Sequence, residues 1–323
     1  MIEKIWYTAD TTHSFLLYEP GVYYVTVFQK YMGNVISVKT EPVYYYHKGS
    51  CPFFRIEEME LTNQCNLACR NCGTPVSKYP KGFMDDRTVL ATLAWTRKGQ
   101  TLNYHRVGEP LLHQQIVKYI RWGVEAGVKP VISTNGLLLT EEKLIQLYSA
   151  GLRHLVITLH TMRSLEAFLM CCGYFTENHI TVKNFSERHV GDGGKDTMYF
   201  QGKILEFPES EIQGREVRHS LDKIPEKYRK YLQKTPVHTW AGNVPGTRRD
   251  FSDDIVIERQ KHCYFIKRKV VNVRWDGSIV GCCFDMENDN VLGNIREYPH
   301  IQTDREHYRL CKHCDANWAV AQE

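Results

Sequence analysis

Three cysteines lie within eight residues, because Cys65, Cys69 and Cys72 are separated by gaps of three and two residues. Three thiolates on one short loop can each bind a different iron of a cubane cluster. A fourth cysteine is missing nearby, so one iron is left open to a small molecule, as one position of a catalytic zinc site is. The spacing therefore predicts a redox-active 4Fe–4S cluster with one open iron.

Two other interpretations of this cysteine loop are a zinc site and a set of unrelated free thiols. Zinc usually takes four protein ligands, with two residues between the members of each pair. The gap of three followed by a gap of two fits that pattern poorly. The spacing favours iron and sulfur over both alternatives.

Composition limits the class of protein. The chain has 323 residues and eleven cysteines, and this odd, clustered set argues against a disulfide framework. Hydrophobic residues make up 42% and charged residues 24%, with a net charge of +4, which is ordinary for a soluble protein and does not indicate nucleic acid. No run approaches the roughly 18 apolar residues of a membrane span, and the N-terminus does not resemble a signal peptide. We expect a cytoplasmic protein without membrane contact.

Strand and helix patterns alternate through the middle of the chain. Strands are predicted over 53–62, 101–105, 128–134 and 154–160, and helices over 86–95, 111–126 and 141–150. Such alternation predicts an α/β fold with a parallel sheet and right-handed crossovers, open or barrel-like. Residues 161–250 are harder to assign, apart from a possible strand in 178–185 and loops at 191–195 and 241–249.

The two ends of the chain differ from this middle part. The first 50 residues contain two strand-like runs joined by a turn at Tyr31–Asn34, and Asp276-Gly277 is typical of a second hairpin near the C-terminus. We expect an N-terminal β-rich extension over 1–52, a core over 53–250 and a small C-terminal domain over 251–323.

Polar motifs end the second, third and fourth predicted strands. Gly108-Glu109-Pro110 offers a carboxylate suited to an ammonium, beside a glycine that permits close backbone approach. Asn135, within Thr134-Asn135-Gly136, can bind ribose hydroxyls, and Thr158 and His160 can point into a pocket. The alternatives are two ordinary turns and a core histidine.

A second group of cysteines lies in the last 61 residues. Cys311-Lys312-His313-Cys314 is a tight pair, Cys282 and Cys283 follow the predicted hairpin, and Cys263 precedes it. Four of these thiolates can enclose a second cluster, and the spacing alone also permits a zinc knuckle.

The cysteine loop and the strand-end motifs resemble the radical S-adenosylmethionine (SAM) superfamily. That resemblance implies a partial (β/α)6 TIM-like barrel in which the open iron binds SAM through its amino and carboxylate groups. Reductive cleavage of SAM then yields a 5′-deoxyadenosyl radical that abstracts hydrogen. The resemblance assigns Gly108 and Glu109 to the SAM amino group, and Thr134, Asn135, Thr158 and His160 to the remaining pocket. Asn71 stands where the superfamily usually has an aromatic residue.

The C-terminal region is similar to the twitch or SPASM-type auxiliary domain of that superfamily. The likeness lies in Asp276-Gly277, Cys282-Cys283 and Leu292-Gly293-Asn294-Ile295. It implies a β-hairpin and helix domain with a second 4Fe–4S cluster, giving two clusters in all. By this pattern the ligands are Cys263, Cys282, Cys311 and Cys314, and Cys283 is spare. Cys51, Cys171 and Cys172 are expected to be structural thiols.

From about residue 55 onward the chain resembles superfamily dehydrogenases that oxidise an amino-cyclitol alcohol. This implies oxidation of a sugar or cyclitol carbinol, with the second electron passing to the auxiliary cluster and a flavodoxin- or ferredoxin-type protein as reductant. Maturation of a ribosomal peptide, modification of a nucleotide and a zinc-binding nucleic-acid module remain alternatives. Catalytic residues are unassigned, although His238, Arg248 and Arg249 are candidate bases from their place in a loop.

Overall fold

The computed structural model describes residues 21–31, 34–45, 54–189, 197–207, 214–237, 239–296 and 309–315. Contacts between residues divide the chain into two compact units, Met1–Cys51 and Pro52–Glu323.

The first unit contains an antiparallel hairpin of two long strands, β1 (Gly21–Tyr31) and β2 (Asn34–Tyr45). Gly21 pairs with Tyr45 and Tyr31 with Asn34, and the register shifts between Gln29 and Lys30. Valine, tyrosine and threonine are frequent in both strands and favour extended backbone. The strands predicted here are confirmed.

The second unit is built on one ten-stranded sheet, whose order is β12-β11-β10-β3-β4-β5-β6-β8-β7, with β9 also paired to β8. The strands are β3 (Arg55–Met59), β4 (Thr101–Asn103), β5 (Lys129–Thr134), β6 (His154–Thr158), β7 (Thr181–Asn184), β8 (Thr197–Glu206), β9 (Leu232–Pro236), β10 (Val270–Val273), β11 (Ser278–Val280) and β12 (Val291–Asn294). All neighbours are parallel except β10–β11 and β11–β12. Within the described residues the outer strands do not pair with each other, so the sheet is open and confirms the predicted partial barrel.

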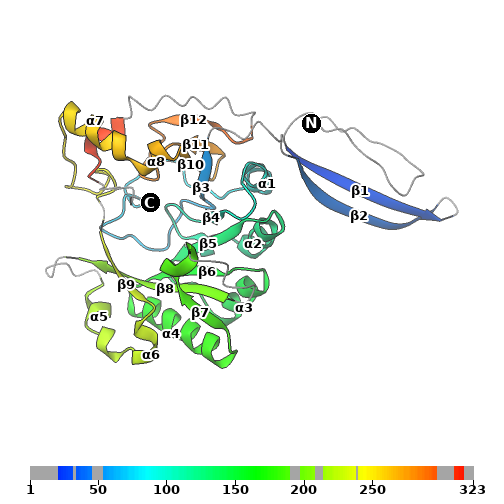
Figure 1. Ribbon diagram of the computed structural model, residues 1–323, viewed down its shortest axis with the longest axis horizontal. Helices are drawn as coiled ribbons and strands as arrows, with labels where there is room; N and C mark the ends of the chain where they lie inside the picture. The colour runs from blue at the N-terminus through cyan, green and yellow to red at the C-terminus, as the bar shows by residue number, and fades with distance from the viewer. Residues whose placement is uncertain are drawn as a thin grey trace. The chain divides into compact units, whose positions relative to one another are not determined.

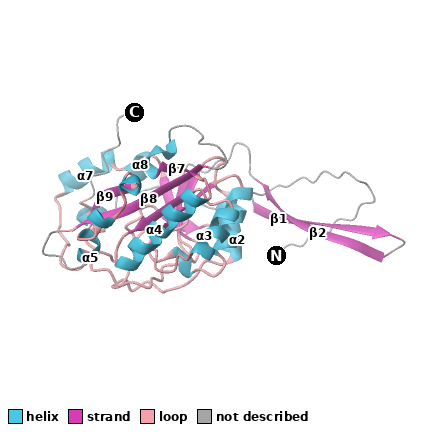
Figure 2. Cartoon of the chain, turned by 90° about the horizontal axis from the view of Figure 1, so that it is seen from below, coloured by secondary structure: helices cyan, strands magenta, loops and turns pink. Residues whose placement is uncertain are grey.

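Four helices follow the early strands and cover one face of the sheet (Figure 1). They are α1 (Asp86–Ala94), α2 (Ile116–Glu125), α3 (Glu141–Ser149) and α4 (Met162–Glu177). Figure 2 shows α2, α3 and α4 side by side. Asp85, Thr140 and Thr161 cap α1, α3 and α4, because each side chain accepts a backbone N–H of the first turn. The helices predicted over 86–95 and 141–150 are confirmed.

The helix predicted from residue 111 begins later. Pro110–Leu112 instead forms a 3-10 turn, and α2 starts at Ile116. The carboxylate of Glu109 accepts the N–H of Leu111 and so caps this short turn. Residues 113–115 separate this turn from the first turn of α2.

The elements beyond residue 160 were mostly not assigned from the sequence. They include α4 and β8, together with the short helices α5 (Arg215–Arg218), α6 (Glu226–Arg229), α7 (Asp253–His262) and α8 (Tyr264–Lys267). Strand β8 is buried along most of its length, so it lacks the alternation that marks a half-exposed strand. Strand β7 confirms the strand expected within 178–185.

The hairpin predicted near the C-terminus is formed by β10 and β11, turning at Asp276-Gly277. Gly277 has φ +89°, and a Cβ there would lie 2.7 Å from Oδ1 of Asn294. Glycine is therefore needed at this turn. The described helices include none that is both long and apolar enough to cross a membrane.

Candidate functional site

The first cysteine loop joins β3 to α1, at the carboxyl ends of the parallel strands. Cys65, Cys69 and Cys72 are partly exposed and form no disulfide among the described residues. The N–H of Leu67 lies 3.4 Å from Sγ of Cys65, and the N–H of Thr74 lies 3.4 Å from Sγ of Cys72. Backbone donors two residues away thus point at two of the sulfurs, an arrangement that favours thiolate ligands.

The third sulfur of this loop faces the end of β6. Sγ of Cys69 lies 3.8 Å from Nδ1 of His160. Burial, together with the nearby Lys203 ammonium, lowers the pKa of His160 to about 4. His160 is therefore neutral at pH 7 and lies directly beside the loop.

Gly108 lets the loop after β4 approach the cysteine loop closely. Its φ is +87°, and a Cβ would lie 2.6 Å from the carbonyl oxygens of both Thr62 and Gln64. The N–H of Glu109 donates to the same Gln64 oxygen at 2.7 Å. Any larger residue at position 108 would push the two loops apart.

Glu109 joins three segments through its carboxylate, which is 2% exposed. Its Oε1 accepts from Leu111 N and Thr134 Oγ1, at 3.0 and 2.7 Å, and its Oε2 accepts from Asn135 N at 2.8 Å. Burial raises the pKa of Glu109, and these hydrogen bonds act in the opposite direction. A carboxylate offers about four acceptor positions, so this one is largely engaged by the protein itself.

Asn135 connects β5 to the cysteine loop. Its Nδ2 donates to Oδ1 of Asn66 at 2.7 Å and lies 3.9 Å from Sγ of Cys65. Its Oδ1 accepts from the N–H of Leu137 at 3.0 Å. Asn135 therefore meets the cysteine loop, but both polar atoms of its amide already bond to protein groups.

The second cysteine group gathers around one hydrophobic cluster, which we call the C-terminal cluster. Its buried members are Ala241, Phe265, Val270, Cys283, Phe284 and Leu310. Four thiols pack against it, those of Cys263, Cys282, Cys311 and Cys314. Figure 1 shows why this is possible, since α7 and α8 lie beside the β10–β11 hairpin and the last described turn lies against α7.

Cys282 and Cys283 are adjacent but have different surroundings. Cys283 is buried in the C-terminal cluster, whereas Cys282 is partly exposed and lies 3.4 Å from the N–H of Phe284. A hydrogen bond between the two sulfurs lowers the pKa of Cys282 and raises that of Cys283. Cys282 thus has the features of a ligand and Cys283 those of a packing residue. On α4, Cys171 and Cys172 are buried as well, and Cys51 lies outside the described residues.

Trp240 connects the two cysteine groups. Its Nε1–H donates to the carbonyl oxygen of Asn71 at 3.0 Å, and its ring meets that of Phe284 with 5.5 Å between centroids. An aromatic ring therefore does lie beside the residue before Cys72, although another part of the chain supplies it. No local signal distinguishes this tryptophan in the sequence.

A buried ion cluster of Glu60, Arg106 and Arg274 was not predicted from the sequence either. Glu60 is within 3.1 Å of Nη1 of Arg106 and 3.4 Å of Nε of Arg274, and all three side chains are at most 1% exposed. Arg106 also donates to the carbonyl oxygen of Asp285, and Arg274 lies 3.6 Å from the ring centre of Tyr79. The cluster therefore ties the ends of β3 and β4 to the chain that follows Cys282.

Both cysteine groups present only thiol donors. In an iron–sulfur cluster each thiolate binds a separate iron, whereas a zinc ion gathers its ligands at one centre. In the part of the chain that the structure describes, no three His, Cys, Asp or Glu side chains lie close enough to hold one metal ion. All-thiol donor sets are those that iron–sulfur clusters use.

Two of the three candidate bases, Arg248 and Arg249, contact the same histidine. Arg248 contacts Nε2 of His313 at 2.5 Å, and the carbonyl oxygen of Arg249 lies 3.2 Å from Nδ1 of the same histidine. Both are thus beside the second cysteine group, and His238 lies outside the described residues.

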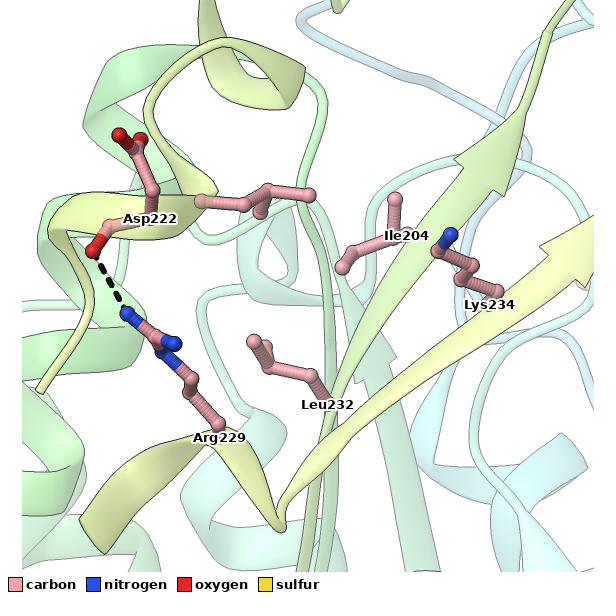
Figure 3. A pocket seen from close by; sticks show the side chains of 6 residues that line it. Ile204, Asp222, Arg229, Leu232 and Lys234 are labelled. Carbon is pink, nitrogen blue, oxygen red and sulfur yellow. Dashed lines mark hydrogen bonds between the residues drawn. The ribbon is translucent and has the colours of Figure 1, made fainter. Parts of the chain in front are cut away.

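A separate hollow of about 310 Å³ lies between β8, β9 and α6 (Figure 3). Its lining combines Ile204, Leu221 and Leu232 with Asp222, Arg229 and Lys234. Arg229 is engaged locally, because it donates to the carbonyl oxygen of Asp222 at 2.7 Å. No cysteine lines this hollow.

Comparison with known proteins shows which proteins the chain resembles. The sequence profile of the Radical SAM superfamily matches residues 59–200. An S-adenosyl-L-methionine-dependent 2-deoxy-scyllo-inosamine dehydrogenase of Niallia circulans is 32% identical over 113 residues, which cover 33% of this chain and 45% of that protein. A cofactor-modifying protein for tungsten-containing aldehyde ferredoxin oxidoreductase, from Pyrococcus furiosus, is 23% identical over 74% of this chain and 77% of its own.

Among solved structures, BtrN in complex with AdoMet and 2-DOIA aligns with a TM-score of 0.45 and 19% identity, over 80% of this chain and 84% of that one. The match to the Niallia protein spans less than half of that protein's length.

Proposed function

Because residues 59–200 form a radical SAM domain, we propose that Cys65, Cys69 and Cys72 hold a 4Fe–4S cluster whose open iron binds SAM. When bound, this pair supplies a 5′-deoxyadenosyl radical that abstracts hydrogen from a substrate. The observation that carries the proposal is the convergence of the cysteine loop with the ends of β4, β5 and β6, where parallel sheets bind ligands.

The chain's own residues would shape the SAM pocket. Glu109 holds Thr134 and Asn135 against the cysteine loop, and Gly108 allows that close approach. No described cation forms an ion pair with Glu109. Burial raises the pKa of its carboxyl group. The remaining acceptor position of Glu109 would therefore gain from an ammonium such as that of SAM.

The second cysteine group would hold an auxiliary 4Fe–4S cluster. The support is that Cys263, Cys282, Cys311 and Cys314 all pack against the C-terminal cluster. Trp240 lies between the two groups and keeps them close within one unit. Such a cluster would accept the second electron of an oxidation, and a flavodoxin- or ferredoxin-type protein would supply the first.

The proposed reaction is oxidation or another modification of a carbinol in a sugar or cyclitol. The named activity of the Niallia relative supports this choice. Asn103 of β4 and Gln201 of β8 are polar residues of the same sheet, and such side chains suit a hydroxyl-bearing molecule.

A second candidate is maturation of a peptide. The observation that favours this function is the β1–β2 hairpin, because in the described residues each of these long strands pairs only with the other. Each outer edge is therefore open to an added strand from a peptide. Co-purification of a short peptide bound to residues 1–52, lost on deleting them, would favour this function over the first.

The experiment that tests the proposal is anaerobic reconstitution with iron and sulfide. We expect about eight irons per chain, broad absorbance near 400 nm, and 5′-deoxyadenosine from SAM under a strong reductant. Cys172→Ala, on α4, is the control and should keep the full iron content. Two zinc ions and no iron would refute the enzyme function.

A further inference from the structure

Lys203 lies on the sheet face that points away from α4. On the opposite face of β8, Phe200 packs against Phe168 and Phe175 of α4, with ring centres 5.2 and 5.3 Å apart. Side chains alternate along a strand, so Lys203, three positions on, points to the other side. We call this other side the inner face.

The inner face brings Lys203 to the proposed radical site. In the parallel register Lys203 is the neighbour of Thr158, the last residue of β6, and such neighbours point to the same side of a sheet. The N–H of Leu159 donates to the carbonyl oxygen of Lys203 at 2.9 Å. His160 follows directly and lies against Cys69. Lys203 is thus one strand away from the residues that contact the cysteine loop.

The ammonium of Lys203 has no anionic partner among the described residues. Burial alone lowers the pKa of Lys203, and no acidic side chain raises it. The charge of Lys203 acts on two buried histidines, His105 and His160. An imidazole is not anionic at pH 7, so neither histidine balances the charge of the ammonium.

Among the described strand residues, register places the carboxyl group of Glu58 on the inner face, and this group does not supply a charge either. Glu58 pairs with Asn103 of β4 and Asn272 of β10. Burial raises the pKa of Glu58 to about 8, so it is mainly protonated at pH 7. The inner face is therefore polar and carries a positive charge at Lys203. A partly buried charge without a counter-ion is costly unless a ligand balances it.

We propose that Lys203, with Thr158 beside it, binds an anionic group of the substrate, a carboxylate or a phosphate. This inference rests on the proposed function, since it takes the substrate to meet the radical beside Cys69. The substrate would then be an acidic or phosphorylated hydroxyl compound. A free amino-cyclitol would place its ammonium against that of Lys203, and like charges repel at this range.

A carboxylate is also present in SAM, so the test must separate two sources. The full chain, reconstituted with its clusters, is treated anaerobically with acetic anhydride, and acetylation of each lysine is followed by mass spectrometry. The probes are inorganic phosphate and succinate, each added with saturating SAM. Lys234, exposed on the neighbouring strand β9, is the internal control.

We expect phosphate or succinate at about ten times its Kd to slow acetylation of Lys203 about tenfold, because only the unbound fraction reacts. Acetylation of Lys234 should not change. Equal acetylation of Lys203 with and without both probes would overturn the inference. Protection by SAM but not by decarboxylated SAM, without any effect of the two probes, would assign the lysine to the cofactor and also overturn it.

Substitution gives an independent readout. Calorimetric titration with phosphate should lose its signal in Lys203→Met and keep it in Lys203→Arg and in the control Lys234→Met. Equal phosphate binding by Lys203→Met would contradict the assignment. Iron content, measured on the same samples, separates the two proposals: absence of iron refutes the radical SAM function, whereas the phosphate results alone decide the role of Lys203.

Discussion

The two cysteine groups are built in different ways. Cys65, Cys69 and Cys72 share one loop, and two of their sulfurs receive N–H groups from residues two positions away. The second group draws its thiols from α7–α8, from the end of β11 and from the last described turn, and they meet only on the C-terminal cluster. The first group is thus a local structure placed at strand ends, and the second exists only where distant segments pack together. Mutations in the two groups should therefore have different effects on iron content and on activity.

The largest contrast is expected from removing one thiol of each group. Cys69→Ala should abolish formation of 5′-deoxyadenosine, because the loop then has two thiolates left. Cys311→Ala should keep SAM cleavage and block substrate turnover. Each variant should retain about four of about eight irons. Normal turnover by both variants would show that the two groups are assigned wrongly.

The second contrast concerns the packing that supports the C-terminal group. Phe284 is 2% exposed, and Phe284→Ala should lower the free energy of unfolding by about 3–5 kcal/mol. It should also release iron from the second group while the first keeps its own. Phe168→Ala, a change of the same kind on α4, is the control and should cost similar stability without selective loss of iron. Equal iron loss in both variants would mean that the C-terminal cluster does not hold the second group.

A third prediction uses pH, because Glu58 lies beneath the C-terminal group. With its amide suitably oriented, Asn272 donates to Glu58 Oε2 at 3.3 Å and accepts from Cys283 N at 3.1 Å. Burial raises the pKa of Glu58 from its ordinary 4.5 to about 8. The folded chain therefore holds this proton more tightly than the unfolded chain does. The resulting stability is fully present below pH 4.5 and is lost as the pH rises through about 8.

Anaerobic urea unfolding at several pH values measures this effect. The contribution of one proton has a slope of at most about 1.4 kcal/mol per pH unit. Glu58→Gln should remove that contribution, whereas Glu166→Gln, at an exposed position of α4, should leave it in place. An identical pH slope in Glu58→Gln and the unmodified chain would contradict the protonated state.

The smallest effect is expected where the two groups are joined. Trp240→Phe keeps a ring but loses the hydrogen bond to Asn71, at a cost of about 1 kcal/mol. Hydrogen exchange should rise in residues 65–74. Trp275→Phe is matched to it, because Nε1 of Trp275 donates to the carbonyl oxygen of Pro80 at 3.2 Å, and it should affect residues 78–83 instead. The same pattern of hydrogen exchange in both variants would mean that Trp240 does not stabilise the cysteine loop.

Much of the fold between residues 53 and 160 could be predicted from the sequence. There each strand is followed by a capped helix, and caps such as Asp85 and Thr140 act within one turn. The prediction failed after residue 160, where β8 is buried on both faces and has no regular alternation. It also failed at Pro110–Leu112, which form a 3-10 turn capped by Glu109 instead of the first turn of α2.

The sequence by itself determined the cysteine spacings, the glycines at the close approaches and the order of strand ends, because these depend on chain neighbours. Only the tertiary structure decided which groups meet across the sheet. Trp240 reaches Asn71 over 169 positions, and Lys203 becomes the neighbour of Thr158 through strand register alone. Such contacts depend on packing between distant segments. No local pattern distinguishes a lysine whose charge is left without a partner from one that is solvated.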